Sequence, residues 1–147
     1  MNHARWLLAL LAACVVAGAG ADPNPDQKAV EVVCGHCHTT AVFLNKPRSW
    51  DRWNDVFADM TKRGTNGTDE QLEKVTRFFL ENLTLVNVNT SASEELAGVL
   101  GVSEEVVQAI IERRQRRRFG NIAELRAFPG VNPDKLEERK TRILFEP

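Results

Sequence analysis

The stretch Cys34-Gly35-His36-Cys37-His38 decides how the first half of this 147-residue chain is interpreted. Cys-x-x-Cys-His is the attachment signal for haem c: the two thiols form thioethers with the porphyrin, and the following histidine ligates the iron. Two cysteines three residues apart on a helical turn point to one side, so the next residue can place its imidazole beneath the ring. The motif therefore predicts a covalent haem c on Cys34 and Cys37, with His38 as an iron ligand.

Other uses of the cysteine pair compete with haem. A local disulfide or a redox-active Cys-x-x-Cys accounts for the two cysteines but not for the histidine that follows them. Zinc needs ligands on more than one side, and one pentapeptide cannot surround the metal. No second arm of cysteine and histidine follows it in the chain. Haem c is the preferred interpretation.

The N-terminal stretch predicts a secretory signal peptide. Met1 to Arg5 form a short positive region, Trp6 to Ala17 are apolar and uncharged, and Ala19-Gly20-Ala21 offers a cleavage site. The apolar run is shorter than the roughly 20 residues of a membrane span. In the alternative, Leu11 to Cys14 act as a lipobox, and only a lipidated Cys14 would attach the protein to a membrane. Both alternatives predict export to the periplasm or beyond, where haem c is attached.

The segment 22–86 predicts three helices. Asp22 to Gln27 is rich in Pro and Asp and predicts an extended arm, and Lys28 to Val33 predicts a short helix that delivers Cys34. Thr39 to Arg48 has no helical period and predicts a loop over one face of the haem. The two longer helices follow this loop.

Both longer helices have start signals and one apolar face each. Ser49 is a suitable N-cap for the first, which ends at Gly64, and Thr68 with Gln71 forms a capping box for the second. The apolar stripes are Trp50, Trp53, Phe57 and Met60 on the first helix, and Leu72, Val75, Phe79 and Leu83 on the second.

Met60 is the candidate for the second iron ligand, opposite His38. It is the only methionine besides the initiator, and it lies 22 residues after His38. A methionine on an apolar stripe is ordinarily core filler, and that alternative stands. Ligation by His and Met raises the reduction potential and leaves no open site, which suits electron transfer. A five-coordinate iron would instead suit ligand sensing or peroxide chemistry, and His36 points away from the distal face.

From Cys34 to Leu83 the chain resembles a short class I-type c cytochrome, in particular the small haem domains fused to bacterial periplasmic dehydrogenases. The motifs are C-G-H-C-H, R-S-W-x-x-W from Arg48, a methionine in that helix, and a closing F-F-L-E-N-L. The haem contacts implied by the resemblance are Cys34, Cys37, His38 and Met60, with Arg48 and Trp53 near the haem edge. The span between His38 and Met60 is shorter than in the larger relatives.

The segment 87–147 carries an internal duplication. A polar hinge, Asn87 to Ser91, precedes helices predicted over Glu94–Leu100, Glu104 to about Arg118, Ile122–Phe128 and Pro133 to about Ile143. The order short helix, Gly-Val-x, helix occurs twice, and the two glycines lie 29 residues apart.

This segment resembles the tandem helix-hairpin-helix domain of exported competence-type DNA receptors. In DNA-binding members, a Gly-hydrophobic-Gly hairpin at a helix N-terminus brings backbone N–H groups to a phosphate. Here the hairpins are Gly101-Val102-Ser103 and Gly130-Val131-Asn132, so the second glycine is absent from both. Ser103 and Asn132 could still donate hydrogen bonds. The predicted DNA contacts are therefore Gly101, Ser103, Gly130 and Asn132.

A basic run ends the longest predicted helix of this segment, and Arg116, Arg117 and Arg118 are its candidates for contacting DNA. The alternative is a solvated helix C-terminus, where the helix dipole favours cations. Residues 87–147 hold ten Lys or Arg and ten Asp or Glu, whereas a dedicated DNA-binding domain would be basic. Docking to a protein therefore stays open beside DNA binding, as in photosystem-associated extrinsic proteins of similar fold.

Together these patterns predict an all-α protein: a signal peptide (1–21), a small three-helix cytochrome c-like domain (22–86) and a tandem helix-hairpin-helix domain (87–147). The predicted function is an exported monohaem electron-transfer protein whose C-terminal module docks to a redox partner or binds DNA. The alternative is a periplasmic DNA-binding protein of the uptake type with an accessory haem domain. No paired carboxylates, nucleophile–base pair or phosphate-cradling loop indicates an enzyme or a small-molecule substrate.

Overall fold

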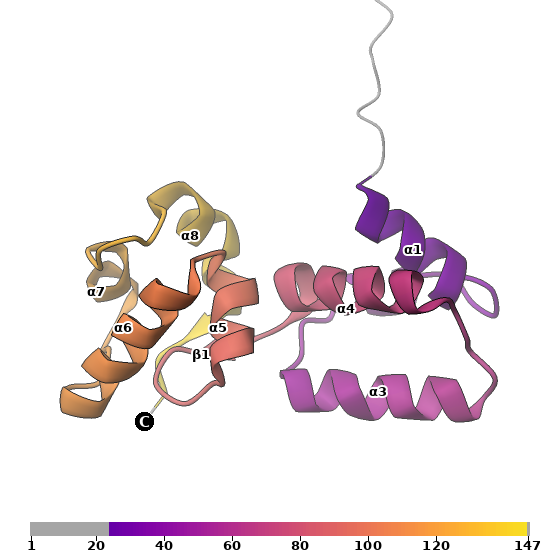
Figure 1. Cartoon of the computed structure of the whole chain (residues 1–147), viewed down its shortest axis with the longest axis horizontal. Helices are drawn as coiled ribbons and strands as arrows, with labels where there is room; N and C mark the ends of the chain where they lie inside the picture. The colour runs from indigo at the N-terminus through magenta and orange to yellow at the C-terminus, as the bar shows by residue number, and fades with distance from the viewer. Residues whose placement is uncertain (1–23, 147) are drawn as a thin grey trace, which may run out of the picture.

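The computed structural model describes residues 24–146, and its architecture is all-α apart from one two-stranded sheet (Figure 1). The predicted signal peptide and Cys14 lie outside the described residues. Within residues 24–146, no helix is both long enough and apolar enough to cross a membrane. The helices of the first half are α1 (Pro25–Cys34), α2 (Ala41–Leu44), α3 (Trp50–Lys62) and α4 (Asp69–Leu83). The second half contains β1 (Val86–Asn87), α5 (Ser93–Leu100), α6 (Glu104–Arg116), α7 (Ile122–Arg126), α8 (Pro133–Arg139), the 3-10 turn η1 (Lys140–Arg142) and β2 (Ile143–Leu144).

Helix α1 begins earlier than the sequence pattern predicts, so the prediction of an extended arm up to Gln27 is wrong. Asn24 is the N-cap, and its side-chain oxygen accepts a 2.9 Å hydrogen bond from the backbone N–H of Asp26. Pro25 occupies the first helical position, where its missing N–H costs nothing. The helix ends at Cys34 and so delivers the cysteine motif, as predicted.

The predicted loop over 39–48 contains a helical turn, α2. The side chain of Phe43 packs against aromatic rings of α3 and α4: its ring centroid lies 6.4 Å from that of Trp53 and 5.2 Å from that of Phe79. Burial of this ring explains why four residues without helical periodicity are ordered. The first half therefore has the three predicted helices and a fourth, short one.

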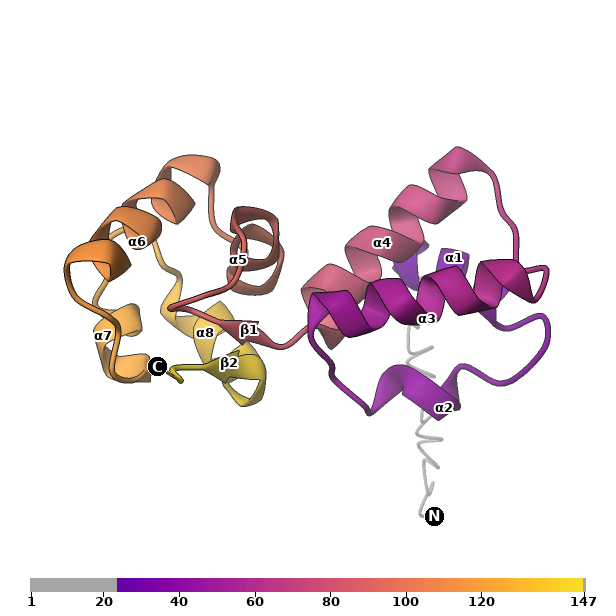
Figure 2. The same ribbon diagram turned by 90° about the horizontal axis from the view of Figure 1, so that it is seen from below.

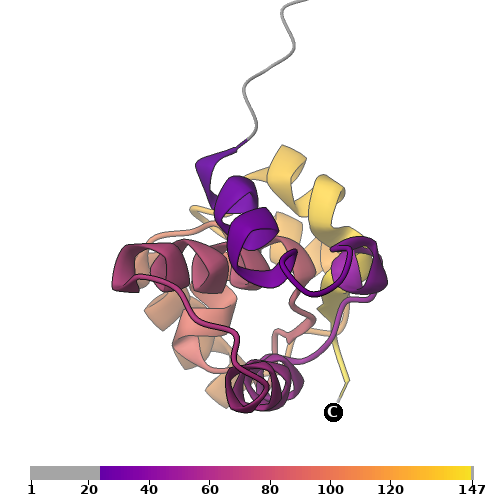
Figure 3. The ribbon, with the colours of Figure 1, turned by 90° about the vertical axis from the view of Figure 1, so that its right-hand side faces the viewer.

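Helices α3 and α4 form as predicted. The capping box of Thr68 and Gln71 is present in both directions, at 3.3 and 2.9 Å. Trp53 is buried, and its indole N–H donates a 2.9 Å hydrogen bond to the carbonyl of Leu83. Helix α1 packs on α4, and α2 and α3 lie on the remaining sides. The four helices therefore surround the centre of the first half (Figure 3).

The polar stretch predicted as a hinge is a hydrogen-bonded structure. Val86 and Asn87 pair in parallel with Ile143 and Leu144, which places β1 beside β2 (Figure 2). The Asn89 side chain accepts from the N–H of Phe119 at 2.8 Å and donates to the carbonyl of the same residue at 2.9 Å. The stretch therefore joins the start of the second half to its last strand and to the connection between α6 and α7.

The two halves have separate hydrophobic cores. The core of the first half includes Val30, Trp53 and Phe79. That of the second half includes Leu96, Ile110 and Phe119. The cores meet where α4 packs against α5, with Leu80 beside Gly98 (Figure 1).

The two predicted hairpins are present in the second half. Gly101 ends α5 and Gly130 precedes α8, and both have positive φ, at 63° and 85°. The end of the chain differs from the sequence prediction, because α8 stops at Arg139 and the next residues form η1 and β2 in place of a helix reaching Ile143.

Candidate functional site

A cavity of about 610 Å³ opens among the four helices of the first half. This volume falls within the range of about 300–1,000 Å³ that is common for small-molecule and cofactor sites. All of the residues for which the sequence predicts haem contact line it: Cys34, Cys37, His38, Met60, Arg48 and Trp53. The structure thus brings the predicted haem residues to one cavity.

The cysteine motif forms one edge of the cavity. Cys34 is the last residue of α1 and half-buried, whereas Cys37 and His38 are exposed in the turn that follows. Both cysteines are free thiols. Burial raises the pKa of the Cys34 thiol, whereas redox-active Cys-x-x-Cys pairs depend on a lowered thiol pKa. The environment of Cys34 is therefore not that of an activated, redox-active thiol.

His38 has a partner for one of its two ring nitrogens. Its Nδ1 lies 3.3 Å from the carbonyl oxygen of Thr39, to which a protonated Nδ1 donates a hydrogen bond. Metal-ligating histidines commonly fix their tautomer through such a bond, which leaves Nε2 as the ligand. The ring also meets Phe43 edge-on, with 6.4 Å between the centroids. These contacts orient the imidazole beside the cavity.

Met60 lines the same cavity from α3. Its side chain is half-buried, so the thioether is neither packed in the core nor fully in solvent. Among the described residues, no three or more His, Cys, Asp or Glu side chains group as a site for a free metal ion. His38 and Met60, the two iron ligands that the sequence predicts, both line the cavity.

The walls of the cavity are aromatic and aliphatic. The rings of Trp53 and Phe57 meet that of Phe79 edge-on, at centroid distances of 4.8 and 4.9 Å. Val42 and Leu72, which are 49% and 42% exposed, also line the cavity. The sequence pattern assigns Leu72 to the core stripe of α4, but the residue faces the cavity mouth. Such walls suit a flat apolar ligand with one edge towards solvent.

Arg48 provides a polar group inside this apolar cavity. Its Nε is buried, and no described residue accepts a hydrogen bond from it. Its guanidinium lies over the Trp53 ring, 5.4 Å from the centroid, and its backbone is held by hydrogen bonds to Leu83 and Leu85. A buried donor without an acceptor is costly, so an anionic group of a ligand would find a fixed partner here. The Trp53 N–H cannot take that role because it donates to Leu83.

Val42 and Phe43 are among the cavity residues that sequence reasoning missed. Both lie in the segment predicted as an irregular loop. The signal that could have found them was the apolar run Ala41 to Leu44, which is too long for an exposed loop.

The helices that follow the two hairpins begin with acidic residues, and polar groups at both helix starts already have hydrogen-bond partners within the chain. Asn132 caps α8, and its side-chain oxygen accepts from the N–H groups of Asp134 and Lys135 at 2.9 and 3.2 Å. Ser103 precedes α6 without capping it, and its hydroxyl donates to Glu105 at 3.0 Å. Since a phosphate would compete with these groups, neither hairpin is arranged as an anion site.

The hairpin glycines have a packing role. A Cβ on Gly130 would lie 2.4 Å from Cγ2 of Val106 on α6. A Cβ on Gly101 would lie 3.3 Å from Nζ of Lys135 on α8 and 3.2 Å from Nη1 of Arg139. Each hairpin therefore packs against the helix of the other repeat. At Gly130 this close approach requires glycine, whereas at Gly101 the neighbouring side chains are flexible and the positive φ is the stronger reason.

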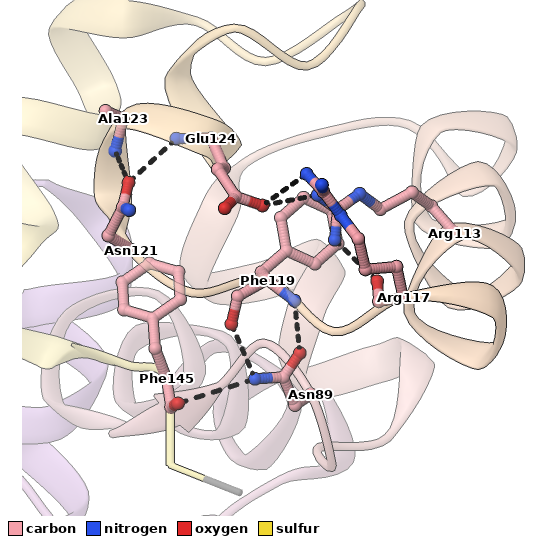
Figure 4. A network of polar contacts seen from close by, with 8 residues as sticks. All are labelled: Asn89, Arg113, Arg117, Phe119, Asn121, Ala123, Glu124 and Phe145. Atoms are coloured by element: carbon pink, nitrogen blue, oxygen red, sulfur yellow. Dashed lines mark hydrogen bonds and ion pairs between the residues drawn. The ribbon is translucent and has the colours of Figure 1, made fainter.

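The basic run at the end of α6 divides into two structural groups, and Figure 4 shows Arg113 of the first with its partners. Arg113 forms an ion pair with Glu124, donates to the carbonyl of Arg117 and stacks 4.0 Å from the Phe119 ring centroid. Arg114 donates to the carbonyls of Val88 and Ser91, and burial lowers its pKa. These two arginines hold the fold together.

The second group, Arg116, Arg117 and Arg118, points into solvent. It lies at the opposite end of α6 from both hairpins, about 18 Å along the helix axis. The structure therefore does not bring the residues for which DNA contact is predicted to one site.

Comparison with protein families gives one match. Residues 81–144 match the family model described as the helix-hairpin-helix motif. This match confirms the helix-hairpin-helix prediction for the second half. No curated protein and no solved structure matches the chain.

Proposed function

We propose that this protein is an exported monohaem c-type cytochrome that transfers electrons, with its C-terminal helix-hairpin-helix module docking it to a partner. One observation carries the proposal: Cys34, Cys37, His38 and Met60 line a single apolar cavity together with Arg48. Each of these residue types has a distinct use in binding haem c.

Cys34 and Cys37 would hold the cofactor covalently, each through a thioether between its sulfur and a vinyl carbon; addition of a thiol to a vinyl group would consume no oxidant. The raised pKa of Cys34 keeps this thiol protonated at neutral pH. Bound haem supplies a reversible one-electron couple.

The other cavity residues would bind the haem and orient its ligands. His38 offers Nε2 while Thr39 holds its other nitrogen, and Met60 offers a soft thioether from α3. The rings of Trp53 and Phe79 provide an apolar wall of the cavity, and Arg48 offers its unpaired Nε to a carboxylate. If both His38 and Met60 ligated the iron, no position would be left for a substrate, so the proposal includes no catalytic residue.

The proposal is tested by co-expression with haem c maturation factors and in-gel peroxidase staining after denaturing electrophoresis. We expect a haem-stained band at the mass of the chain. Cys34→Ser with Cys37→Ser should abolish it, whereas Ser103→Ala, far from the cavity, should leave it unchanged. An unstained band from soluble, folded wild-type protein would reject the proposal.

A second candidate is a DNA-binding protein of the uptake type. The match to the helix-hairpin-helix family model and the exposed Arg116, Arg117 and Arg118 favour it. In this alternative the haem is structural or regulates DNA binding. Absence of affinity for duplex DNA at low salt would reject it.

A further inference from the structure

Three neighbouring arginines at the end of α6 form an exposed surface whose side chains contribute little to the stability of the fold. The side chain of Arg116 is 80% exposed and lies 3.5 Å from Glu112, and that of Arg117 is 75% exposed and lies 3.4 Å from Glu124. Exposed pairs of this kind contribute about 0–1 kcal/mol. Arg118 is exposed and has no hydrogen-bonding or ion-pairing side chain beside it among residues 24–146. We call Arg116, Arg117 and Arg118 the arginine surface.

The backbone that carries the arginine surface is rigid. Arg113 donates to the carbonyl of Arg117 at 2.5 Å, and Asn89 holds both backbone groups of Phe119 (Figure 4). Arg118 lies between these two anchored residues. A surface fixed in advance loses less conformational entropy on binding than a flexible tail would.

Charge is polarised along α6. The first turns of α6 and α8, at the hairpins, carry Glu104, Glu105 and Asp134. The opposite end carries the arginine surface, and it lies at the side of the molecule away from α4 (Figure 1). An anionic partner is therefore attracted to the end of α6. At the hairpins the carboxylates of the first turns are offset by Lys135 and Arg139, which lie beside Gly101, so no net attraction is concentrated there.

The helix dipole does not account for all of these arginines. Cations are favoured within the last turn of a helix, where Arg113, Arg114 and Arg116 lie. Arg117 is the C-cap with extended backbone, at φ −155° and ψ 124°, and Arg118 follows it outside the helix. These two positions gain little from the dipole and suffer the repulsion of neighbouring like charges.

We infer that the arginine surface, and not the two hairpins, is where this module binds the phosphate backbone of duplex DNA. The inference rests on the DNA-binding candidate above and names its contact residues. Guanidinium groups match phosphate through paired hydrogen bonds. The large hydrophobic residues that are exposed in residues 24–146 are Val32, Val42 and Leu72, none of them beside this surface. Phosphate contacts therefore suit it better than a protein interface, which would need an apolar centre.

The test measures binding of the full-length chain to a fluorescent duplex by anisotropy over a range of salt concentrations. One variant removes the surface: Arg116→Gln, Arg117→Gln and Arg118→Gln. Its charge-conserving counterpart carries Lys at the same positions. A hairpin variant, Ser103→Asp with Asn132→Asp, keeps residues suited to N-caps but places negative charge at both hairpins. A control with Arg52→Gln, Arg63→Gln and Arg126→Gln removes the same total charge elsewhere.

The inference predicts that the glutamine variant loses binding and that the slope of log affinity against log salt falls by about 2.7, or about 0.9 for each phosphate that is no longer neutralised. The hairpin variant and the charge control should bind within about threefold of wild type. The lysine variant should keep the salt slope of wild type but bind more weakly, because an ammonium group cannot make the paired hydrogen bonds of a guanidinium. If the hairpin variant loses affinity while the glutamine variant retains it, the inference is wrong but DNA binding stands. If wild type shows no affinity at low salt, the DNA-binding candidate itself fails. Circular dichroism of each variant checks that it is folded.

Discussion

Arg142 donates a 2.7 Å hydrogen bond from Nη2 to the carbonyl oxygen of Glu81, and its Nη1 donates to the carbonyl of Thr84 at 3.2 Å. The side chain comes from η1 near the end of the chain and satisfies carbonyls at the C-terminus of α4. Burial lowers its pKa to about 10, so it is still charged at neutral pH. The cavity side of the same turn is held by Trp53, which donates to the carbonyl of Leu83. The end of α4 therefore links the cavity to the helix-hairpin-helix module.

Replacing Arg142 by Met should destabilise the protein by about 2–3 kcal/mol, because two buried carbonyls lose a charged donor. The free energy of unfolding from denaturant titration measures this. Arg126→Met is the matched control: Arg126 forms an exposed ion pair with Glu137, and its loss should cost about 0–1 kcal/mol. Equal effects of the two substitutions would show that the link through Arg142 is not important for stability.

The ion pair between Asp26 and Arg77 predicts a pH dependence of stability. Arg77 donates from Nε and Nη2 to the two carboxylate oxygens at 2.6 and 2.7 Å, and these bonds hold the pKa of Asp26 below its ordinary value. A lowered folded-state pKa stabilises the fold above the unfolded pKa of about 3.9, and that contribution is lost as the pH falls through the folded value.

We therefore expect Asp26→Asn to be less stable than wild type by about 1–2 kcal/mol at neutral pH, with the difference shrinking below about pH 4. Melting temperatures of both proteins from pH 7 to pH 2 test this. A difference of the same size at pH 2 would contradict the role given to the carboxylate.

Alanine substitutions at two glycines with positive φ distinguish the cost of backbone strain from that of steric overlap. Gly64 has φ 98° and no atom within 4 Å of a built Cβ, whereas a Cβ at Gly130 would overlap the stiff side chain of Val106. Gly64→Ala should cost about 1–2 kcal/mol from strain alone. Gly130→Ala should cost about 2–4 kcal/mol, because overpacking adds to the strain. Similar losses in a denaturant titration would mean that the hairpin packing against α6 relaxes freely.

Met60→Leu tests the second iron ligand. Leucine keeps the volume and apolar character of the side chain but cannot ligate iron. The oxidised protein should lose the methionine–iron absorption band, and its reduction potential should fall because the thioether favours reduced iron. Retention of both properties would show that Met60 fills the cavity wall without ligating.

The sequence predicted local features of the site more successfully than contacts between distant residues. The end of α1 at Cys34, the capping box at Thr68 and the hairpins at Gly101 and Gly130 each follow from neighbouring residues. By contrast, the roles of Arg113 and Arg116 look alike in the sequence. They differ because Arg113 reaches Glu124, and that contact depends on where α7 packs.

Two errors have different origins. The start of α1 was missed although Asn24 and Pro25 form a recognisable helix start, so that signal was present in the sequence. The parallel pairing of Val86 with Ile143 joins residues 57 positions apart through two strands of two residues each. No periodic pattern marks so short a strand, and the pairing follows from the packing of the duplicated helices between them.

The most direct test of the central claim is the optical spectrum of the reduced, purified protein in alkaline pyridine. Pyridine displaces protein ligands from the iron, so the spectrum reports the porphyrin substituents alone. We predict the α-band of a haem with both vinyl groups saturated by thioethers, shifted towards that of free protohaem in Cys34→Ser and Cys37→Ser single variants. A wild-type band at the position of free protohaem, or no haem band, would contradict the account.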